Sequence, residues 1–242
     1  DHVQVRGAGE LLGLLRERGI PHLFLTNNSS ARAEDYRLRL REIGIEAWPG
    51  QVLTSGTATI HHLHHHTPHR SAYVVGTPAL EQEFRDGGIE LDEADPDCVV
   101  VGFDTTLTYA KLERACALLF AGKPYYATHP DRTCITARGR IPDIAAIIAG
   151  LEAVTGRTPE VIGKPGPGIV QAALERLGSR AAATAMVGDQ LDTDMTRARR
   201  SGLCGVLVLS GETSRERLEA CPREQRPTLV ATSVAQVAQW LG

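Results

Sequence analysis

The chain has 242 residues, of which 42% are hydrophobic, and it carries a formal net charge of −3. This composition is typical of a globular protein that is large enough to bury a substantial core. No basic stripe predicts nucleic-acid binding, and no apolar run approaches the roughly 20 residues that span a membrane. The five cysteines are scattered without a C-x-x-C pair, which favours a reduced, cytoplasmic protein over a disulfide framework.

Helices and strands are expected to alternate along the first 55 residues. An apolar helical face over residues 8–15, ended by Gly19, predicts a first helix. A short apolar strand is expected at 22–26, a helix at 33–43 and a further strand at 51–55. This alternation is typical of a parallel sheet in an α/β fold.

A change of composition in residues 57–69, which carry six of the nine histidines, predicts a domain boundary. A second alternating series is expected beyond it: strands at 72–75, 98–101 and 125–128, helices at 78–85, 110–120 and 143–155, and a polar loop at 129–141. The first pattern resumes with a strand at 160–162, and it continues with helices at 168–177 and 234–241 around strands at 185–187, 205–209 and 228–230. We therefore expect an α/β unit at 57–159 inserted into another formed by 1–56 and 160–242.

An acidic turn follows the predicted strand at 185–187. Three carboxylates, Asp189, Asp192 and Asp194, lie within six positions of one another. Clustered oxygen ligands at the carboxyl end of a strand suit Mg²⁺. The alternative is an acidic first turn that complements the dipole of the next helix.

Two polar segments follow strands and offer groups that suit an anion. Thr26, Asn27 and Asn28 supply a hydroxyl, two amides and backbone N–H groups that can hold a phosphate. Taken alone, the segment favours the alternative of an Asx-turn with helix capping by Ser29 or Ser30. Lys164 lies in the glycine-rich segment 163–168, which matches neither a Walker A loop nor a dinucleotide fingerprint. A lysine held between strand and helix suits a fixed positive charge beside a phosphoryl group.

Two further features are interpreted as structural. The loop Gly102–Leu107 contains Asp104 after a strand, but it lies inside the inserted unit, far along the chain from the other polar groups. The pairs His61/His65 and His62/His66 have helical spacing that can chelate Zn²⁺ or Ni²⁺. Because no cysteine or acid stands beside them in the sequence, we interpret them as a solvated helix with adventitious affinity for metals.

Three motifs, taken in their order along the chain, resemble those of the haloacid dehalogenase (HAD) superfamily. They are Leu25–Ser30, Val161–Pro165 and Val187–Asp194, and they resemble the NagD-like/para-nitrophenylphosphatase branch, which has a type IIA cap. Further similarity at 102–104, 127–131 and 151–157 extends the resemblance over essentially the whole chain. It implies a Rossmann-like parallel-sheet core (1–56 and 160–242) with an inserted α/β cap (57–159), and Mg²⁺-dependent hydrolysis of a phosphomonoester through an aspartyl-phosphate.

Leu25–Ser30, Val161–Pro165 and Val187–Asp194 resemble the second, third and fourth motifs of the family. The resemblance assigns a role to each matching residue of the second and third motifs. Thr26 matches the residue whose hydroxyl binds the phosphoryl group. Asn27, through its backbone N–H, and Asn28 are expected to bind the phosphate with it. Lys164 matches the lysine that stabilises phosphate and nucleophile. Thr26 and Lys164 are therefore the expected catalytic residues.

The fourth motif and the cap loop supply the remaining assignments. Asp189 matches the Mg²⁺ ligand and Asp194 its supporting acid, whereas Asp192 has no reserved role. His129 and Asp131 lie in a loop that resembles the Asn-Pro-Asp substrate-specificity loop of the family, with His in place of Asn. The replacement of Asn by His is expected to affect which substrate is bound and not the reaction that is catalysed.

The first motif of the family, Asp-x-Asp-Gly, would supply the nucleophile and end the first core strand. Arg6-Gly7-Ala8 aligns with the segment that opens the following helix, so the nucleophile is expected roughly seven residues before Asp1, with the first core strand outside the sequence given. Asp1 is not expected to be the nucleophile.

The expected function is Mg²⁺-dependent hydrolysis of a small phosphomonoester such as a sugar phosphate. The alternative is a non-catalytic relative that binds phosphate or metal and lacks the nucleophile. The expected partner is a small phosphorylated metabolite, with no nucleic acid and no membrane, and the resemblance also implies a homodimer formed through the cap.

Overall fold

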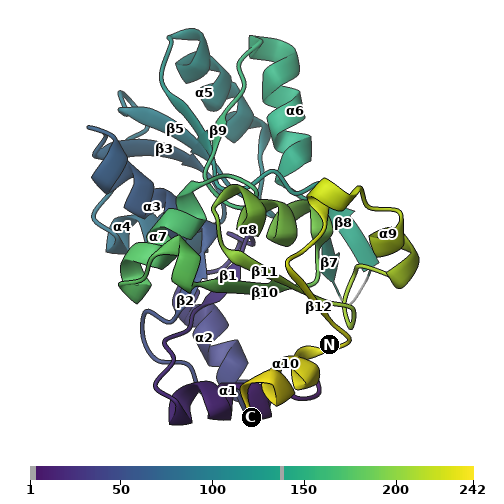
Figure 1. Cartoon of the computed structure of the whole chain (residues 1–242). Helices are drawn as coiled ribbons and strands as arrows, with labels where there is room; N and C mark the ends of the chain where they lie inside the picture. The colour runs from purple at the N-terminus through teal and green to yellow at the C-terminus, as the bar shows by residue number, and fades with distance from the viewer. Residues whose placement is uncertain (1–3, 137–138) are drawn as a thin grey trace. The chain divides into compact units, whose positions relative to one another are not determined.

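Helices and mostly parallel strands alternate along the computed structural model, which describes residues 4–136 and 139–242 (Figure 1). The chain divides into two compact units. The five-stranded unit comprises Leu25–Tyr36 and Val52–Ala172, and the three-stranded unit comprises Asp1–Phe24, Arg37–Gln51 and Ala173–Gly242. Asp1 itself lies outside the described residues. The core and cap boundaries expected from the sequence remain predictions.

The five-stranded unit is built on a parallel sheet with the strand order β4-β3-β5-β6-β9. Its strands are β3 (Ser71–Val75), β4 (Glu90–Leu91), β5 (Cys98–Val101), β6 (Tyr125–Ala127) and β9 (Glu160–Val161). The central strand β5 is an uninterrupted apolar run that is buried throughout, as expected where helices cover both faces of a parallel sheet. β1 (Phe24–Thr26) and β2 (Val52–Thr54) form a separate two-stranded sheet.

Helices cover both faces of this five-stranded sheet (Figure 1). They are α3 (Ser55–His66), α4 (Pro78–Asp86), α5 (Tyr109–Phe120) and α6 (Ile144–Thr155). α5 and α6 pack against each other and bury Leu118, Ile147 and Leu151 against Val99 and Val101 of the sheet. The remaining helix of this part of the chain, α7 (Gly168–Leu177), follows the segment that contains Lys164.

Side chains at strand ends determine where these helices begin. Thr54 closes a capping box with Thr57 at the start of α3, and Thr77 accepts from the backbone N–H of Leu80 at the start of α4. Asp143 caps α6 by accepting from the backbone N–H of Ile144 at 2.6 Å. The polar residues that follow the strands are therefore held in defined turns at the carboxyl end of the sheet.

The polar loop expected at 129–141 contains regular structure that the sequence did not predict. Strands β7 (Thr133–Thr136) and β8 (Gly139–Pro142) pair as an antiparallel hairpin. Thr133 and Ile135 are exposed while Cys134 and Thr136 are half-buried, so the hairpin lacks the strong apolar alternation that would have revealed it.

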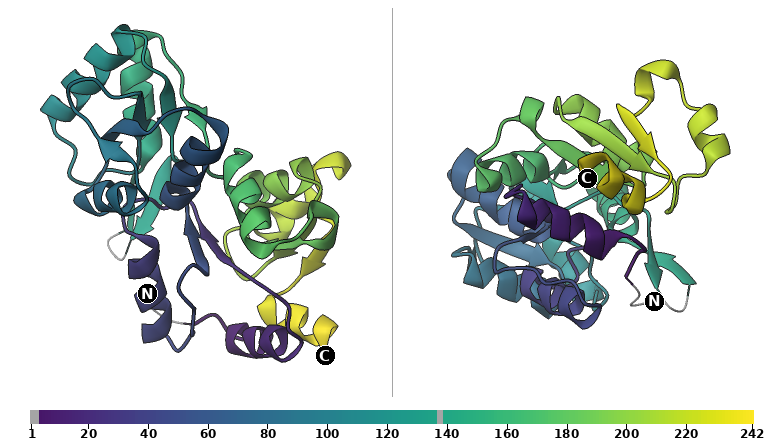
Figure 2. Two further views of the ribbon diagram at one scale, coloured as in Figure 1. Left: turned by 90° about the vertical axis from the view of Figure 1, so that its left-hand side faces the viewer. Right: turned by 60° about the horizontal axis from the view of Figure 1, so that its bottom comes forward.

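The three-stranded unit contains a parallel sheet with the order β10-β11-β12. The strands are β10 (Ala185–Gly188), β11 (Cys204–Val208) and β12 (Leu229–Ala231). Its helices are α1 (Ala8–Glu17), α2 (Ala33–Glu42), which begins in the other unit, α8 (Thr196–Arg200), α9 (Arg215–Glu219) and α10 (Val234–Leu241), with the short helices η1 (Ala181–Ala183), η2 (Leu191–Met195) and η3 (Arg223–Gln225). α1 and α10 lie side by side (Figure 2), and Leu11 and Val237 pack on the Val206 face of the sheet. No helix among the described residues has the length and apolar character needed to cross a bilayer.

A buried carboxylate in the five-stranded unit makes the stability of that unit depend on pH. Glu83 accepts from the backbone N–H of Ala33 at 2.6 Å and from the Thr54 hydroxyl at 3.0 Å, and burial raises its pKa despite these two hydrogen bonds. Because the folded pKa exceeds the unfolded one, the stabilising contribution is complete at low pH and is lost as pH rises from about 4.5 through the folded pKa. Glu83→Gln, measured by thermal unfolding from about pH 4 to 8, should therefore flatten this fall and leave the variant at least as stable as wild type at neutral pH. A steeper fall in the variant would contradict the assignment.

Candidate functional site

The side chain of Asn27 joins three loops of the five-stranded unit. Its Nδ2 donates to the carbonyl oxygen of Lys164 at 2.8 Å and to both carboxylate oxygens of Asp131 at 3.2 Å, while its Oδ1 accepts from the backbone N–H of Lys164 at 2.9 Å. The backbone carbonyl of Asn27 accepts a short hydrogen bond from the Ser55 hydroxyl. The loops after β1, β6 and β9 are thus held together by one buried amide.

The surroundings of Asn27 fix which way its amide points. A flipped amide would set its oxygen against the Lys164 carbonyl and the Asp131 carboxylate, all of which only accept hydrogen bonds. The observed orientation uses both amide protons and the amide oxygen, so Asn27 is fully paired. Any acceptor-only residue at this position would lose the contacts that join the loops.

Thr26 and Asn28 form a local polar turn beside Asn27. The Thr26 hydroxyl accepts from the backbone N–H of Asn28 at 3.2 Å, and Oδ1 of Asn28 accepts from the backbone N–H and the hydroxyl of Ser30 at 2.9 and 2.7 Å. This is the Asx-turn that the sequence offered as an alternative, and it presents Thr26 at the end of β1. The phosphate-binding roles of Thr26, Asn27 and Asn28 remain predictions.

Lys164 is placed by the glycine before it and by a proline after it. A Cβ on Gly163 would clash with the Thr128 carbonyl and would lie 3.0 Å from Oδ1 of Asn27, so the close approach of these loops requires glycine. The Lys164–Pro165 peptide bond is cis. The backbone carbonyl of Lys164 and the carboxylate of Asp131 both accept from Nδ2 of Asn27.

Asp131 is a half-buried carboxylate with a perturbed proton affinity. Burial raises its pKa, against the opposing effects of the neighbouring His129, the hydrogen bond from Asn27 and the positive charge of Lys164. Its backbone carbonyl accepts from the N–H of Ala145 at 3.1 Å in the first turn of α6. Asp131 is thus fixed through both its side chain and its backbone.

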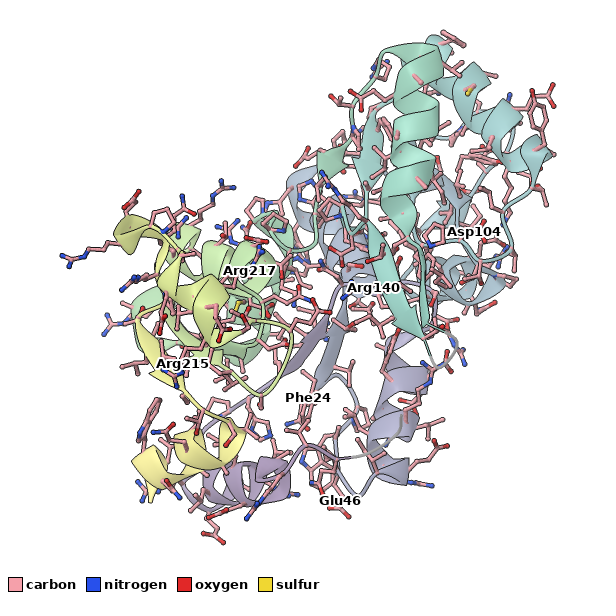
Figure 3. The ribbon with its side chains drawn as sticks, turned by 90° about the vertical axis from the view of Figure 1, so that its right-hand side faces the viewer. Phe24, Glu46, Asp104, Arg140, Arg215 and Arg217 are labelled. Carbon is pink, nitrogen blue, oxygen red and sulfur yellow. The ribbon has the colours of Figure 1, made fainter. Side chains whose placement is uncertain are left out.

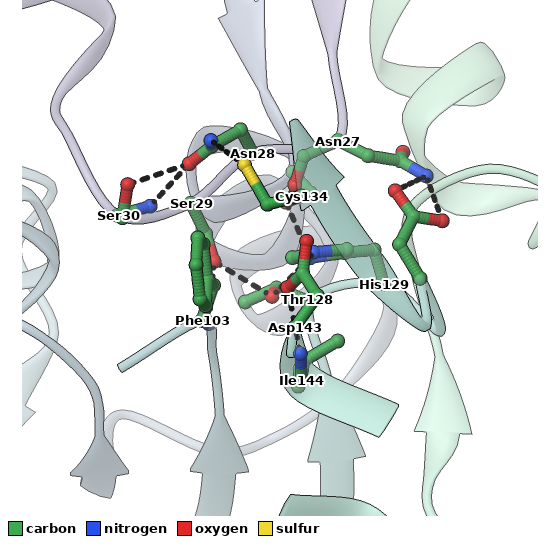
Figure 4. A network of polar contacts seen from close by, with 12 residues as sticks. Asn27, Asn28, Ser29, Ser30, Phe103, Thr128, His129, Cys134, Asp143 and Ile144 are labelled. Carbon is green, nitrogen blue, oxygen red and sulfur yellow. Dashed lines mark hydrogen bonds and ion pairs between the residues drawn. The ribbon is translucent and has the colours of Figure 1, made fainter. Parts of the chain in front are cut away.

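His129 is fully buried and makes hydrogen bonds on both sides of its ring (Figure 4). Its Nδ1 lies 2.9 Å from the Thr128 hydroxyl and 3.4 Å from that of Ser55, and its Nε2 lies 3.1 Å from Oδ1 of Asp143. The expected role of His129 in substrate choice remains a prediction, and a buried ring can exercise such a role only through the groups that it contacts.

The acidic turn of the three-stranded unit holds two of its carboxylates in defined positions. Oδ2 of Asp189 accepts from the backbone N–H of Glu212 at 2.8 Å, and buried Asp194 accepts from the N–H of Gln190 at 3.3 Å. A Cβ on Gly188 would clash with the carboxylate of Asp194, so this packing requires glycine at the end of β10. The turn continues into η2, which has π-helical geometry, a feature that is frequent at functional sites.

Asp189 and Asp194 fit the Mg²⁺ that the family resemblance implies. Both are carboxylates, the oxygen ligands that Mg²⁺ prefers, and Oδ1 of Asp189 accepts no hydrogen bond from the described residues. The third acid of the turn behaves differently, because Asp192 is exposed and pairs closely with Arg217 of α9, the residue labelled in Figure 3. The assignment of Asp189 and Asp194 as metal ligands remains a prediction.

Asp104 makes structural contacts within its own unit, whereas the interpretation of the histidine-rich helix remains a prediction, since Glu160 lies 3.5 Å from Nε2 of His62. The buried carboxylate of Asp104 pairs with Nζ of Lys111 at 2.7 Å and accepts from Thr106, which fixes the loop after β5 (Figure 3). In α3 the rings of His61 and His65 lie 4.3 Å apart. Among the described residues, three potential metal ligands converge at His129, Asp131 and Asp143, with their ligand atoms within 4.8 Å of one another, and not on this helix.

Sequence reasoning missed several residues that support the candidate sites. Asp143, Thr128 and Ser55 surround His129, and Glu212 supports Asp189 through its backbone. Only Asp143 carried a local signal, as an acid before an apolar run, and that signal predicts a helix start and not a partner for His129. Thr128 is adjacent to His129 in the sequence, whereas Ser55 and Glu212 lie 74 and 23 positions from the residues that they contact.

Comparison with known proteins places the chain in a family. Residues 1–90 match the family model described as haloacid dehalogenase-like hydrolase, and residues 161–237 match an HAD-hydrolase-like model. The dihydroxyacetone phosphatase of Corynebacterium glutamicum is 34% identical to this chain, with 97% of this chain and 84% of that protein covered. The ribonucleotide monophosphatase NagD of Escherichia coli K12 is also 34% identical, with 98% and 92% covered.

The chain belongs to the NagD-like branch of the HAD superfamily. A solved structure of the 4-nitrophenylphosphatase of Thermotoga maritima is 40% identical and superimposes with a TM-score of 0.95, covering all of this chain and 92% of that one. This NagD-like HAD protein therefore has the α/β fold expected from its sequence, and it is an HAD phosphatase.

Proposed function

We propose that this HAD phosphatase hydrolyses a small phosphomonoester, with bound Mg²⁺ and through an aspartyl-phosphate. The names of its relatives support a phosphorylated metabolite as substrate, since they include a dihydroxyacetone phosphatase, a ribonucleotide monophosphatase and, in Staphylococcus aureus, an acid sugar phosphatase. The observation that carries the proposal is the amide of Asn27, which holds the Thr26 turn, the Lys164 backbone and Asp131 together at strand ends. Ligands of open α/β sheets bind at such carboxyl ends.

In this proposal the residues of the five-stranded unit bind and orient the phosphoryl group. The Thr26 hydroxyl and the backbone N–H groups beside it would donate to phosphoryl oxygens, and Lys164 would neutralise the negative charge that develops during transfer. Asp131 would contact the part of the substrate that carries the phosphate, as the specificity-loop resemblance implies. His129 and Asn28 complete the proposed site.

The acidic turn would hold the metal ion. Asp189 would bind Mg²⁺ through the carboxylate oxygen that the Glu212 N–H leaves available, and Asp194 would support the turn from its buried position. When bound, Mg²⁺ supplies charge stabilisation to a transferring phosphoryl group. The attacking carboxylate is expected from the first motif of the family, which the resemblance places before Asp1.

Three further proposals accompany this function. Residues 1–56 and 160–242 would form the catalytic core and 57–159 the cap, and the cap would mediate a homodimer. The five cysteines are free, and their scattered positions support a reduced, cytoplasmic location for the protein.

The proposal is tested by measuring phosphate release from a panel of phosphomonoesters with the full protein, including the first motif. Turnover of sugar phosphates, dihydroxyacetone phosphate, nucleoside monophosphates and para-nitrophenyl phosphate is compared with and without EDTA. We expect release that is restored by Mg²⁺ after chelation. Binding of inorganic phosphate without turnover of any ester would instead support a non-catalytic member of the family.

A further inference from the structure

A chain of buried hydrogen bonds determines where the protons of His129 lie. The backbone N–H of Phe103 donates to the Ser29 hydroxyl at 3.0 Å, and the Ser29 and Thr128 hydroxyls are 3.0 Å apart. If Ser29 donates to Thr128, then Thr128 donates to Nδ1 of His129 at 2.9 Å. Each hydroxyl then gives one hydrogen bond and accepts one, and Nδ1 carries no proton (Figure 4).

The opposite side of the ring leads to the same assignment. Asp143 is a carboxylate whose Oδ1 already accepts from the N–H of Ile144, so Nε2 of His129 must carry a proton to pair with it at 3.1 Å. A ring protonated at both nitrogens would reverse the hydroxyl chain. Ser29 would then receive two donors, and its own proton would have no acceptor among the contacts of the described residues.

His129, so fixed, is one of three attachments between its loop and the start of α6. The N–H of Asp143 donates to the carbonyl of Arg132 at 3.0 Å, and the N–H of Ala145 donates to the carbonyl of Asp131 at 3.1 Å. Together with the His129–Asp143 contact, these bonds hold the backbone on both sides of Asp131. The backbone of Asp131 is therefore held by the start of α6, and its carboxylate by Asn27.

We propose that Thr128 and Asp143 are positioning residues that hold His129 as a neutral imidazole with its proton on Nε2, and that through His129 they fix Asp131 for substrate selection. This proposal rests on the proposed phosphatase function for its effect on selectivity. It assigns His129 an indirect role, in keeping with its complete burial. Residues that orient a contacting group through a hydrogen bond commonly affect function by about 10-fold to 100-fold.

The first experiment observes the proton directly and requires no turnover. Nitrogen-15 NMR of histidine-labelled full protein at neutral pH should contain one imidazole with a protonated Nε2 and a bare Nδ1, and this signal should be absent from His129→Gln. Thr128→Val removes the donor to Nδ1 while Asp143 keeps the proton on Nε2, so a second proton should appear on Nδ1, and Thr128→Ser should restore the bare Nδ1. A ring protonated at Nδ1 in wild type would overturn the proposal.

The second experiment measures selectivity with a matched control. Thr128→Val and Asp143→Ala should change the ratio of kcat/KM between two phosphomonoesters by about tenfold, with inhibition by inorganic phosphate within about twofold of wild type. Thr133→Val makes the same substitution at an exposed position of the neighbouring hairpin, and it should leave the ratio unchanged. Equal effects of the two valine variants would overturn the proposal.

Two outcomes distinguish this proposal from a failure of the proposed phosphatase function and from a metal site at His129, Asp131 and Asp143. If wild-type protein hydrolyses no ester, the proposed function fails, while the NMR result still reports on the network. If Mn²⁺ broadens the His129 signal and this broadening is lost in Asp143→Asn, the three groups form a metal site and the positioning role is wrong.

Discussion

Asp189→Asn is expected to lower Mg²⁺-dependent kcat/KM by about 100-fold or more, because an amide cannot supply the anionic oxygen that stabilises a bound divalent cation. The amide oxygen of the new side chain can still accept from the N–H of Glu212, so the turn should keep its structure. The melting temperature in EDTA should therefore stay within about 2 °C of wild type. Steady-state kinetics at saturating Mg²⁺ and thermal unfolding in EDTA measure the two effects.

Asp192→Asn provides the matched control for this prediction. It makes the same substitution three residues along, at an exposed carboxylate whose observed partner is Arg217. A surface ion pair contributes little, so the control should keep its activity and its stability. Equal losses in the two variants would show that the negative charge of the whole turn matters and not a ligand at Asp189.

Asn27→Asp is expected to lower kcat/KM by about 100-fold or more and to destabilise the five-stranded unit. The change removes both amide donors and sets a carboxylate where Nδ2 now lies 3.2 Å from the Asp131 oxygens. Two unit charges about 4 Å apart near a protein surface repel by roughly 4 kcal/mol, which is enough to separate the loops. Thermal unfolding should show a lowered melting temperature that recovers partly on acidification, because protonation of either carboxyl removes the repulsion.

Two companion variants separate charge from contact at Asn27. Asn28→Asp adds the same charge one residue away but keeps the acceptor that Ser30 uses, so its melting temperature should remain close to wild type. The double variant Asn27→Asp/Asp131→Asn restores one donor and one acceptor between the two positions and should recover part of the lost stability. If the double variant were less stable than Asn27→Asp alone, the contact between these side chains would not be the cause.

Much of the fold could be predicted because apolar runs and chain-reversal residues coincide in the sequence. The strand Cys98–Val101 and the helix Gly168–Leu177 have the bounds expected from their patterns, since each is an apolar segment flanked by polar or glycine-rich turns. The hairpin of β7 and β8 was missed because its exposed strands lack an apolar face. Local patterns therefore predict elements that build the core better than those that lie on its surface.

The sequence offers candidate site residues, and their roles remain predictions, but it does not offer the contacts between them. Asn27 was expected to contribute its backbone N–H to a phosphate, whereas the structure shows what its side chain does, which depends on residues more than one hundred positions away. His129 lies in a polar loop, and its buried ring contacts the hydroxyl of Ser55, which is 74 positions away in the sequence. Such non-local pairings leave no periodic signal in the sequence.

The hydrogen bonds of the Asn27 side chain differ in whether they depend on the identity of the partner residue. Both bonds to residue 164 go to its peptide N–H and carbonyl groups, which every amino acid except proline provides in full, so they do not depend on the side chain at that position. These two hydrogen bonds therefore do not themselves require an ammonium group at position 164. The hydrogen bonds to residue 131 do depend on the side chain at that position, because the carboxylate of Asp131 accepts them. A substitution at position 164 would thus change the charge there and keep the two backbone hydrogen bonds to Asn27. A substitution at position 27 or 131 would break the contact between these side chains unless the other position changed as well.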